Sequence, residues 1–138
     1  PGPVARSTWI GTSMTNLLLV AFGGAIGASA RHLVNMASMR LAGPSFPWGT
    51  LVVNLVGCLA MGILVEVIAR RLEASGALRL FLATGVLGGF TTFSAFSLDF
   101  ALLWERGAAG HALAYALASV LGSLAAVFLG LWLARQFA

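Results

Sequence analysis

The stretch GVLGGFTTFSAFS, residues 85–97, lies inside a long apolar segment that runs over residues 78–104. A bilayer core takes about 20 apolar residues per helix, so this segment is long enough to cross a membrane. Two adjacent glycines, Gly88 and Gly89, and two adjacent threonines, Thr91 and Thr92, disfavour an unbroken helix at its centre. Backbone groups released in lipid must find protein, water or an ion, because hydrocarbon offers no partner. We therefore expect a spanning helix that is broken at mid-membrane; the alternative is a continuous helix with glycines at a crossing and hydroxyls bonded to their own backbone.

Three more apolar segments are long enough to span a bilayer, over residues 16–35, 48–69 and 111–137. Pro47 stands just before the second segment, where a helix tolerates proline, and Arg70 and Arg71 close it. Because the connections are short, neighbouring helices are expected to be antiparallel. The sequence predicts an all-α membrane protein, one domain of four transmembrane helices, and residues 1–13 are expected to be an N-terminal extension, partly foreign to the natural chain.

Composition excludes several other classes of protein. Hydrophobic residues make up 59% of the chain and charged residues 9%, and a soluble four-helix bundle would need polar helix faces that these segments lack. The net charge of +4 comes from dispersed arginines, which form no basic run, so nucleic-acid binding is not expected. Cys58 alone cannot make an internal disulfide. His32 and His111 lie near segment ends without a paired nucleophile or metal set, so we expect no enzyme activity.

The arginines are spread almost evenly between the two sides of the predicted bundle. Five lie on the side of the termini, at positions 6, 70, 71, 79 and 135, and three lie on the other, at positions 31, 40 and 106. Since arginine bias sets the orientation of membrane helices, so weak a bias allows both orientations. This balance suits an inverted, antiparallel homodimer.

Polar residues inside the segments recur at four-residue spacing, which places them on one helix face. The second segment carries Thr50, Asn54, Cys58 and Gly62, the fourth carries Tyr115, Ser119 and Ser123, and the third adds Thr92, Ser94 and Ser97. Such groups can simply join helices. Two stripes together favour a track of uncharged hydrogen-bond donors.

Phe93 and Phe96 are three residues apart, so they share a helix face. A phenylalanine pair usually faces lipid or core, but an aromatic ring carries partial positive charge at its edge and can contact an anion without binding it tightly. A cation path would be expected to show acidic residues or carbonyl rings, and a larger anion pore often shows arginine or lysine. The residues therefore predict a path for a small anion, without choosing which anion.

The sequence closely resembles the Fluc (CrcB) family of small dual-topology fluoride channels. The resemblance rests on residues 88–97 (GGFTTFSAFS), 48–54 (WGTLVVN) and 23–31 (GGAIGASAR), and it extends over all four segments. It implies an antiparallel dual-topology homodimer in the inner (plasma) membrane, with two fluoride pathways lined from both subunits. It also implies passive export of cytoplasmic fluoride with strong preference over chloride.

The resemblance also implies roles for particular residues. Phe93 and Phe96 match the family's "Phe box", and Asn54 matches its pore-lining asparagine. Tyr115, Ser119 and Ser123 fall at the spacing of the fourth-helix pore residues. The backbone carbonyls of Gly88 and Thr91, from both subunits, would hold a central structural sodium ion.

Four other positions are less settled by the resemblance. Ala95 and Asp99 depart from it, since many members carry a hydroxyl at the first position and glutamate is the residue expected in a relative at the second. Arg31 is either a cation at a pore vestibule or, as we prefer, an interfacial anchor. Glu66 is expected to pair with Arg70, four residues on.

Two rival functions come from other classes of protein. A small dual-topology proton-coupled exporter would need an ionisable group deep in the membrane, and Asp99 and Glu66 both lie near segment ends. A non-transporting assembly subunit would use the polar stripes to join helices.

Overall fold

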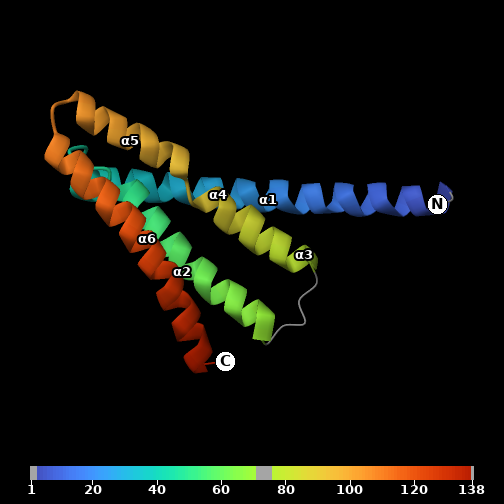
Figure 1. Cartoon of the computed structure of the whole chain (residues 1–138). Coiled ribbons are helices and arrows are strands. Elements are labelled where there is room, and N and C mark those ends of the chain that lie inside the picture. Colours follow the sequence, from blue (N-terminus) through green and yellow to red (C-terminus); the bar gives the residue numbers. More distant parts are fainter. Residues whose placement is uncertain (1–2, 71–75, 138) are drawn as a thin grey trace.

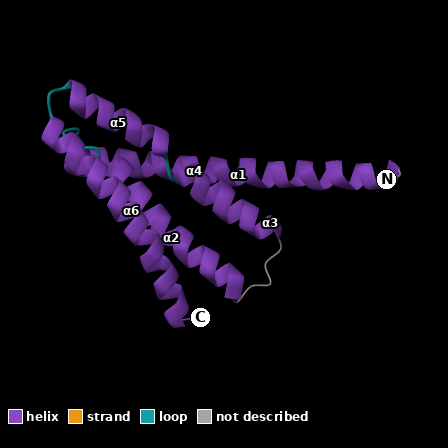
Figure 2. Cartoon of the chain, in the orientation of Figure 1, coloured by secondary structure: helices purple, strands orange, loops and turns teal. Residues whose placement is uncertain are grey.

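The computed structural model describes residues 3–70 and 76–137, with side chains from residue 13 onward. Over these ranges the chain is helical apart from short connections, and it contains no strand (Figure 2). Four helical stretches are long and apolar enough to cross a membrane: Ser13–Ala42, Trp48–Arg70, Gly76–Glu105 and Ala109–Phe137. The predicted all-α architecture with four candidate spans is therefore confirmed.

Helix α1, Pro3–Ala42, is longer than the predicted 16–35 at both ends. Residues 36–42 contain neither glycine nor proline, so nothing in the sequence stops the helix before Gly43. Gly43 has φ +78°, and its N–H donates to the carbonyl of Met39 at 3.0 Å, which is a glycine-terminated helix end. The predicted extension is part of α1 from Pro3 on; residues 1 and 2, the Arg6 side chain and Arg71 lie outside what the structure describes.

Helices α2, Trp48–Arg70, and α6, Ala109–Phe137, form the most extensive pair in the molecule. Their backbones approach closely at Gly62 and Gly130: a Cβ added to Gly62 would lie 3.1 Å from the Cα of Gly130. Near the C-terminal ends of α2 and α6, the buried Glu66 carboxylate contacts Arg70 Nε and lies 3.2 Å from Arg135 Nε. The predicted pairing of Glu66 with Arg70 is confirmed, and Arg135 adds a link between the two helices.

The third span is divided into α3 Gly76–Arg79, a π-helix η1 Leu80–Leu87, α4 Gly88–Phe90 and α5 Phe93–Glu105. Helix α1 packs backbone to backbone on η1 and α4, because Gly23 and Gly27 face them and Gly85 and Gly89 face α1. Thr91 and Thr92 are both extended, at φ −79°, ψ 154° and φ −153°, ψ 123°. The expected break is thus present near the centre of the span, as the short loop between α4 and α5 (Figure 2).

The two connections over residues 43–47 and 106–108 lie together at one end of the molecule, away from both termini (Figure 1). A small core sits at this end, built around the buried Leu51, Leu103, Ala112 and Tyr115. Elsewhere large apolar side chains are exposed, as Phe22 and Phe128 are at 69% each. Such an outer surface suits lipid or a second membrane helix rather than water.

Candidate ion pathway

The break in the third span is held open by the side chain of Asn54. The backbone N–H of Thr92 donates to Asn54 Oδ1 at 2.8 Å, and Asn54 Nδ2 donates to the carbonyl oxygen of Thr92 at 3.0 Å. One amide side chain thereby satisfies both backbone groups of an extended residue. Asn54 therefore has a structural role besides its predicted place in the pathway, and one of its two N–H donors is already used.

The same break frees two backbone carbonyls from their helical donors. In an α-helix the carbonyl of residue i accepts from the amide of residue i+4. The Thr92 amide that would serve Gly88 is bonded to Asn54, and the Ala95 amide that would serve Thr91 donates instead to Thr92 Oγ1 at 3.1 Å. In transporters with unwound membrane helices, backbone carbonyls released from helical hydrogen bonds coordinate Na⁺. The two predicted sodium ligands thus fit a hard cation.

A cavity of about 520 Å³, which we call the Phe cavity, opens beside the break. It is lined by Asn54, Cys58, Gly88, Thr91, Thr92, Phe93, Phe96, Ser119, Val120, Ser123 and Leu124. Most of the predicted pathway residues and both predicted sodium ligands are among them. None of these lining residues is an acid, an arginine or a histidine, so the polar groups that face the space are uncharged.

The two phenylalanines differ in their surroundings. Phe93 is 75% exposed, whereas Phe96 is half-buried and its ring centroid lies 5.2 Å from that of Tyr115. The centroids of Phe93 and Phe96 are 5.4 Å apart with the rings tilted by 49°. The pair therefore shares one face, as the spacing predicts, and both rings border the Phe cavity.

The stripe on α6 places three hydroxyls at successive turns. Tyr115 is fully buried, and its hydroxyl donates to Asp99 Oδ2 at 3.0 Å. Ser119 is 5% exposed, and its Oγ has no hydrogen-bond partner within the described part of the chain. Ser119 also lines the Phe cavity.

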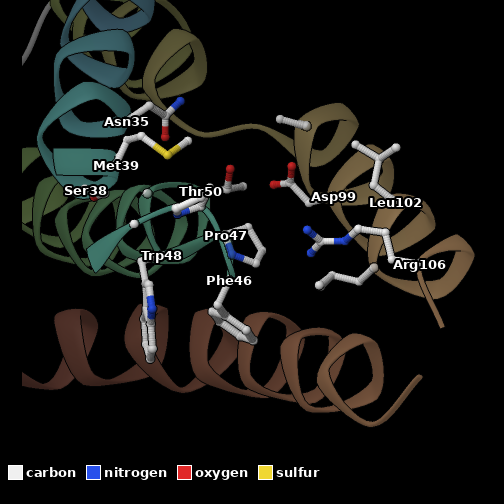
Figure 3. A pocket seen from close by; sticks show the side chains of 15 residues that line it. Asn35, Ser38, Met39, Phe46, Pro47, Trp48, Thr50, Asp99, Leu102 and Arg106 are labelled. Atoms are coloured by element: carbon white, nitrogen blue, oxygen red, sulfur yellow. The ribbon is translucent and has the colours of Figure 1, made fainter. Parts of the chain in front are cut away.

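A second cavity, of about 460 Å³, lies at the end where the two connections meet; we call it the loop cavity. Thr50 and Asp99 extend into it from opposite sides, and Arg106 lines it near Pro47 (Figure 3). The Asp99 carboxylate that borders this space is the group that holds Tyr115. Tyr115 lines neither cavity, but it is bonded to a residue of the loop cavity and lies one helical turn before Ser119 of the Phe cavity.

Four residues predicted for the pathway or its vestibule line neither of these two cavities: Tyr115, Ser94, Ser97 and Arg31. Ser94 Oγ lies 3.3 Å from Thr92 Oγ1, and Ser97 Oγ donates to the carbonyl of Phe93 at 3.0 Å, a bond within its own helix. Arg31 is half-buried on α1. Their roles in ion passage remain predictions.

Sequence reasoning missed the contacts that Asp99 makes with Tyr115 and that Arg106 makes with Ser45. Asp99 continues the three-residue spacing of Phe93 and Phe96, and that spacing is the signal that places it on the same face. For Arg106 the sequence held no comparable signal, because its position depends on how two connections far apart in the chain meet.

Known proteins are similar in sequence to this chain over most of its length. Residues 18–131 match the family model described as CrcB-like protein, Camphor Resistance. A protein of Mesorhizobium japonicum is 63% identical over 123 residues, and one of Agrobacterium fabrum is 64% identical over 123 residues; each alignment covers 89% of this chain and 98% of the relative. A protein of Sphingopyxis alaskensis is 52% identical over 123 residues, with the same coverage. All three relatives carry the name fluoride-specific ion channel FluC.

Proposed function

We propose that this chain, which belongs to the CrcB-like protein family, is a fluoride-specific ion channel. It is a multi-pass membrane protein, and fluoride passes through it passively, down its electrochemical gradient. The observation that carries this proposal is the Phe cavity, where hydroxyls and an amide face the space together with two phenyl rings and no charged side chain.

The chemistry of this lining suits a very small halide. Fluoride accepts hydrogen bonds strongly, so the hydroxyls of Ser119 and Ser123 and the remaining N–H of Asn54 can replace water that the ion leaves behind. Phenyl edges of Phe93 and Phe96 add a weak attraction. Because no charged side chain faces the Phe cavity, the lining side chains hold the ion only weakly. Chloride is larger and a weaker acceptor, so the same donors compensate less of its lost hydration.

We further propose that two copies assemble as an antiparallel homodimer with two pathways, in the inner (plasma) membrane. The 75% exposure of Phe93 supports this, because a pathway residue on the surface of one subunit gains a wall from a second. The nearly even distribution of arginines supports dual orientation. A Gly110→Cys variant, labelled in sealed vesicles from one side and then the other, should react from both sides. Labelling from one side alone would contradict dual topology.

The carbonyls of Gly88 and Thr91 from both subunits would hold a structural Na⁺ at the centre of this dimer. The support is their release from helical hydrogen bonds at the break. When bound, Na⁺ would supply a positive charge that compensates the carbonyl dipoles.

The test of the proposed function is fluoride efflux from liposomes that contain the purified protein, followed with a fluoride electrode. Fluoride should leave when a potassium ionophore dissipates the membrane potential, and chloride should remain inside. Fluoride retained at the level of protein-free liposomes would overturn the proposal.

A proton-coupled exporter is the second candidate, and one observation favours it. Asp99 is half-buried and bonded to Tyr115, so an ionisable group is connected to the pathway more closely than its place near a segment end indicated. Efflux with the proton gradient abolished by a protonophore separates the two functions. A channel keeps its rate, whereas a coupled exporter loses it.

A further inference from the structure

Arg106 is held over the loop cavity by a contact between the two connections at that end of the molecule. It follows α5, and its Nη2 donates to the backbone carbonyl of Ser45 at 3.3 Å, although 61 residues separate them. Figure 3 shows the guanidinium turned back from α5 over the space beside Pro47. An exposed arginine that only anchored the chain in headgroups would need no such contact.

Arg106 forms no ion pair with a carboxylate within the described residues, although the carboxylate of Asp99 lines the same cavity. Within the described residues, both ion pairs involve Glu66, at the other end of α2, and none involves Arg106. The other charged group that lines the loop cavity is Asp99, which accepts the Tyr115 hydroxyl instead. Arg31 and Arg40, on α1, do not line this cavity. The field of Arg106 is therefore available to a mobile anion.

Polar groups on α2, α5 and α6 line the two cavities. Thr50, 6% exposed, and Asp99 lie inside the loop cavity, and Asp99 binds Tyr115. Ser119, one helical turn farther along α6, lines the Phe cavity. The lining of the loop cavity thus includes charged residues, whereas the lining of the Phe cavity is uncharged.

We infer that the loop cavity is the mouth of the fluoride pathway and that Arg106 is the residue that concentrates anions there. This inference rests on the proposed channel function and adds to it an entry site. A cation in a cleft with low-dielectric walls raises the local concentration of anions, and the effect falls as ionic strength rises. Fluoride then moves on to neutral donors, which bind it without holding it.

The experiment compares Arg106→Gln with Arg40→Gln, an equal charge change on an exposed arginine that lies outside the loop cavity. Initial fluoride efflux is measured at subsaturating fluoride in about 0.02 M and about 0.5 M of an impermeant salt. We expect Arg106→Gln to reduce the rate by about threefold to tenfold at low salt and by less than about twofold at high salt. Arg40→Gln should stay near wild type, and Arg106→Lys, which keeps the charge, should recover most of the rate.

Several results would overturn the inference. Equal rates for Arg106→Gln and wild type at low salt, or equal losses in the two glutamine variants, would exclude a local role for this charge. If Arg106→Gln does not fold, the salt dependence of wild-type efflux is the test. The inference requires that the wild-type rate falls as salt rises. A wild-type rate that is independent of salt excludes a charged mouth. A wild-type protein that passes no fluoride would refute the channel function itself, which keeps the two failures distinct.

Discussion

Replacement of Asn54 by leucine tests the link between the break and ion passage. The leucine is similar in size but makes no hydrogen bond, so both bonds to Thr92, at 2.8 and 3.0 Å, are lost together. The freed Thr92 amide can then return to the carbonyl of Gly88 and partly restore the helix. That return would also remove a carbonyl from the proposed sodium site.

The magnitude follows from the two bonds. A buried backbone group left without a partner costs about 1–3 kcal/mol, whereas side-chain hydrogen bonds in membrane proteins average about 0.6 kcal/mol with a maximum near 1.7. Because the Thr92 amide can return to Gly88 and the Thr92 carbonyl, at the N-cap of α5, also accepts within that helix, we expect a loss of about 1–2 kcal/mol in the free energy of unfolding. Loss of one donor to the ion, at about 1–1.5 kcal/mol, should lower fluoride flux by about tenfold.

The assay is equilibrium unfolding in mixed detergent micelles, followed by tryptophan fluorescence, with flux measured on the same preparations. Val56→Ala is the matched control, because Val56 lies on the same helix and is 50% exposed. Its cost should stay below about 0.5 kcal/mol. An Asn54→Leu protein as stable as this control and as active as wild type would refute the reasoning.

Three further predictions use other parts of the structure. Gly27→Ala should destabilise the fold by about 1–3 kcal/mol, because its Cβ would collide with a backbone carbonyl of η1; Gly24→Ala, with open space around it, should change stability by less than about 0.5 kcal/mol, and equal effects in unfolding measurements would count against the crossing. Phe93→Ile and Phe96→Ile should both reduce fluoride flux, but Phe96→Ile should also lower thermal stability because the Phe96 ring packs on Tyr115, whereas Phe93 is 75% exposed; unchanged flux would remove the altered ring from the pathway. Exchange of all Na⁺ for a large organic cation should abolish flux without dissociating the protein, and unaltered flux would contradict the sodium site.

Much of the fold was predictable because bilayer physics constrains it tightly. Segment length and apolarity alone predict four spans, and the glycine and threonine pairs at residues 88–92 predict the break. The start of α2 after Pro47 follows from the rules of helix ends. The extra length of α1 was not predicted, because hydropathy locates the apolar part of a helix and not the point where the backbone stops being helical.

Several residues that line the Phe cavity were predicted from the sequence, whereas their hydrogen-bond partners were not. Spacing placed Asn54, Ser119 and Ser123 on faces that meet, and the structure brings them together at the Phe cavity. Which partner each donor takes depends on the distances between helices, and the spacing of residues along the sequence does not give these distances. The clamp of Asn54 on Thr92 and the bond of Ser97 to its own helix are therefore visible only in three dimensions.

The central claim is that uncharged donors and phenyl edges select a very small halide, and the reversal potential of the reconstituted protein tests it most directly. With fluoride on one side of a planar bilayer and chloride on the other, at equal concentrations, fluoride should carry essentially all the current. The account predicts a reversal potential displaced far from zero in the direction that opposes fluoride flow. A reversal potential near zero would mean that chloride passes as readily, and it would contradict the account.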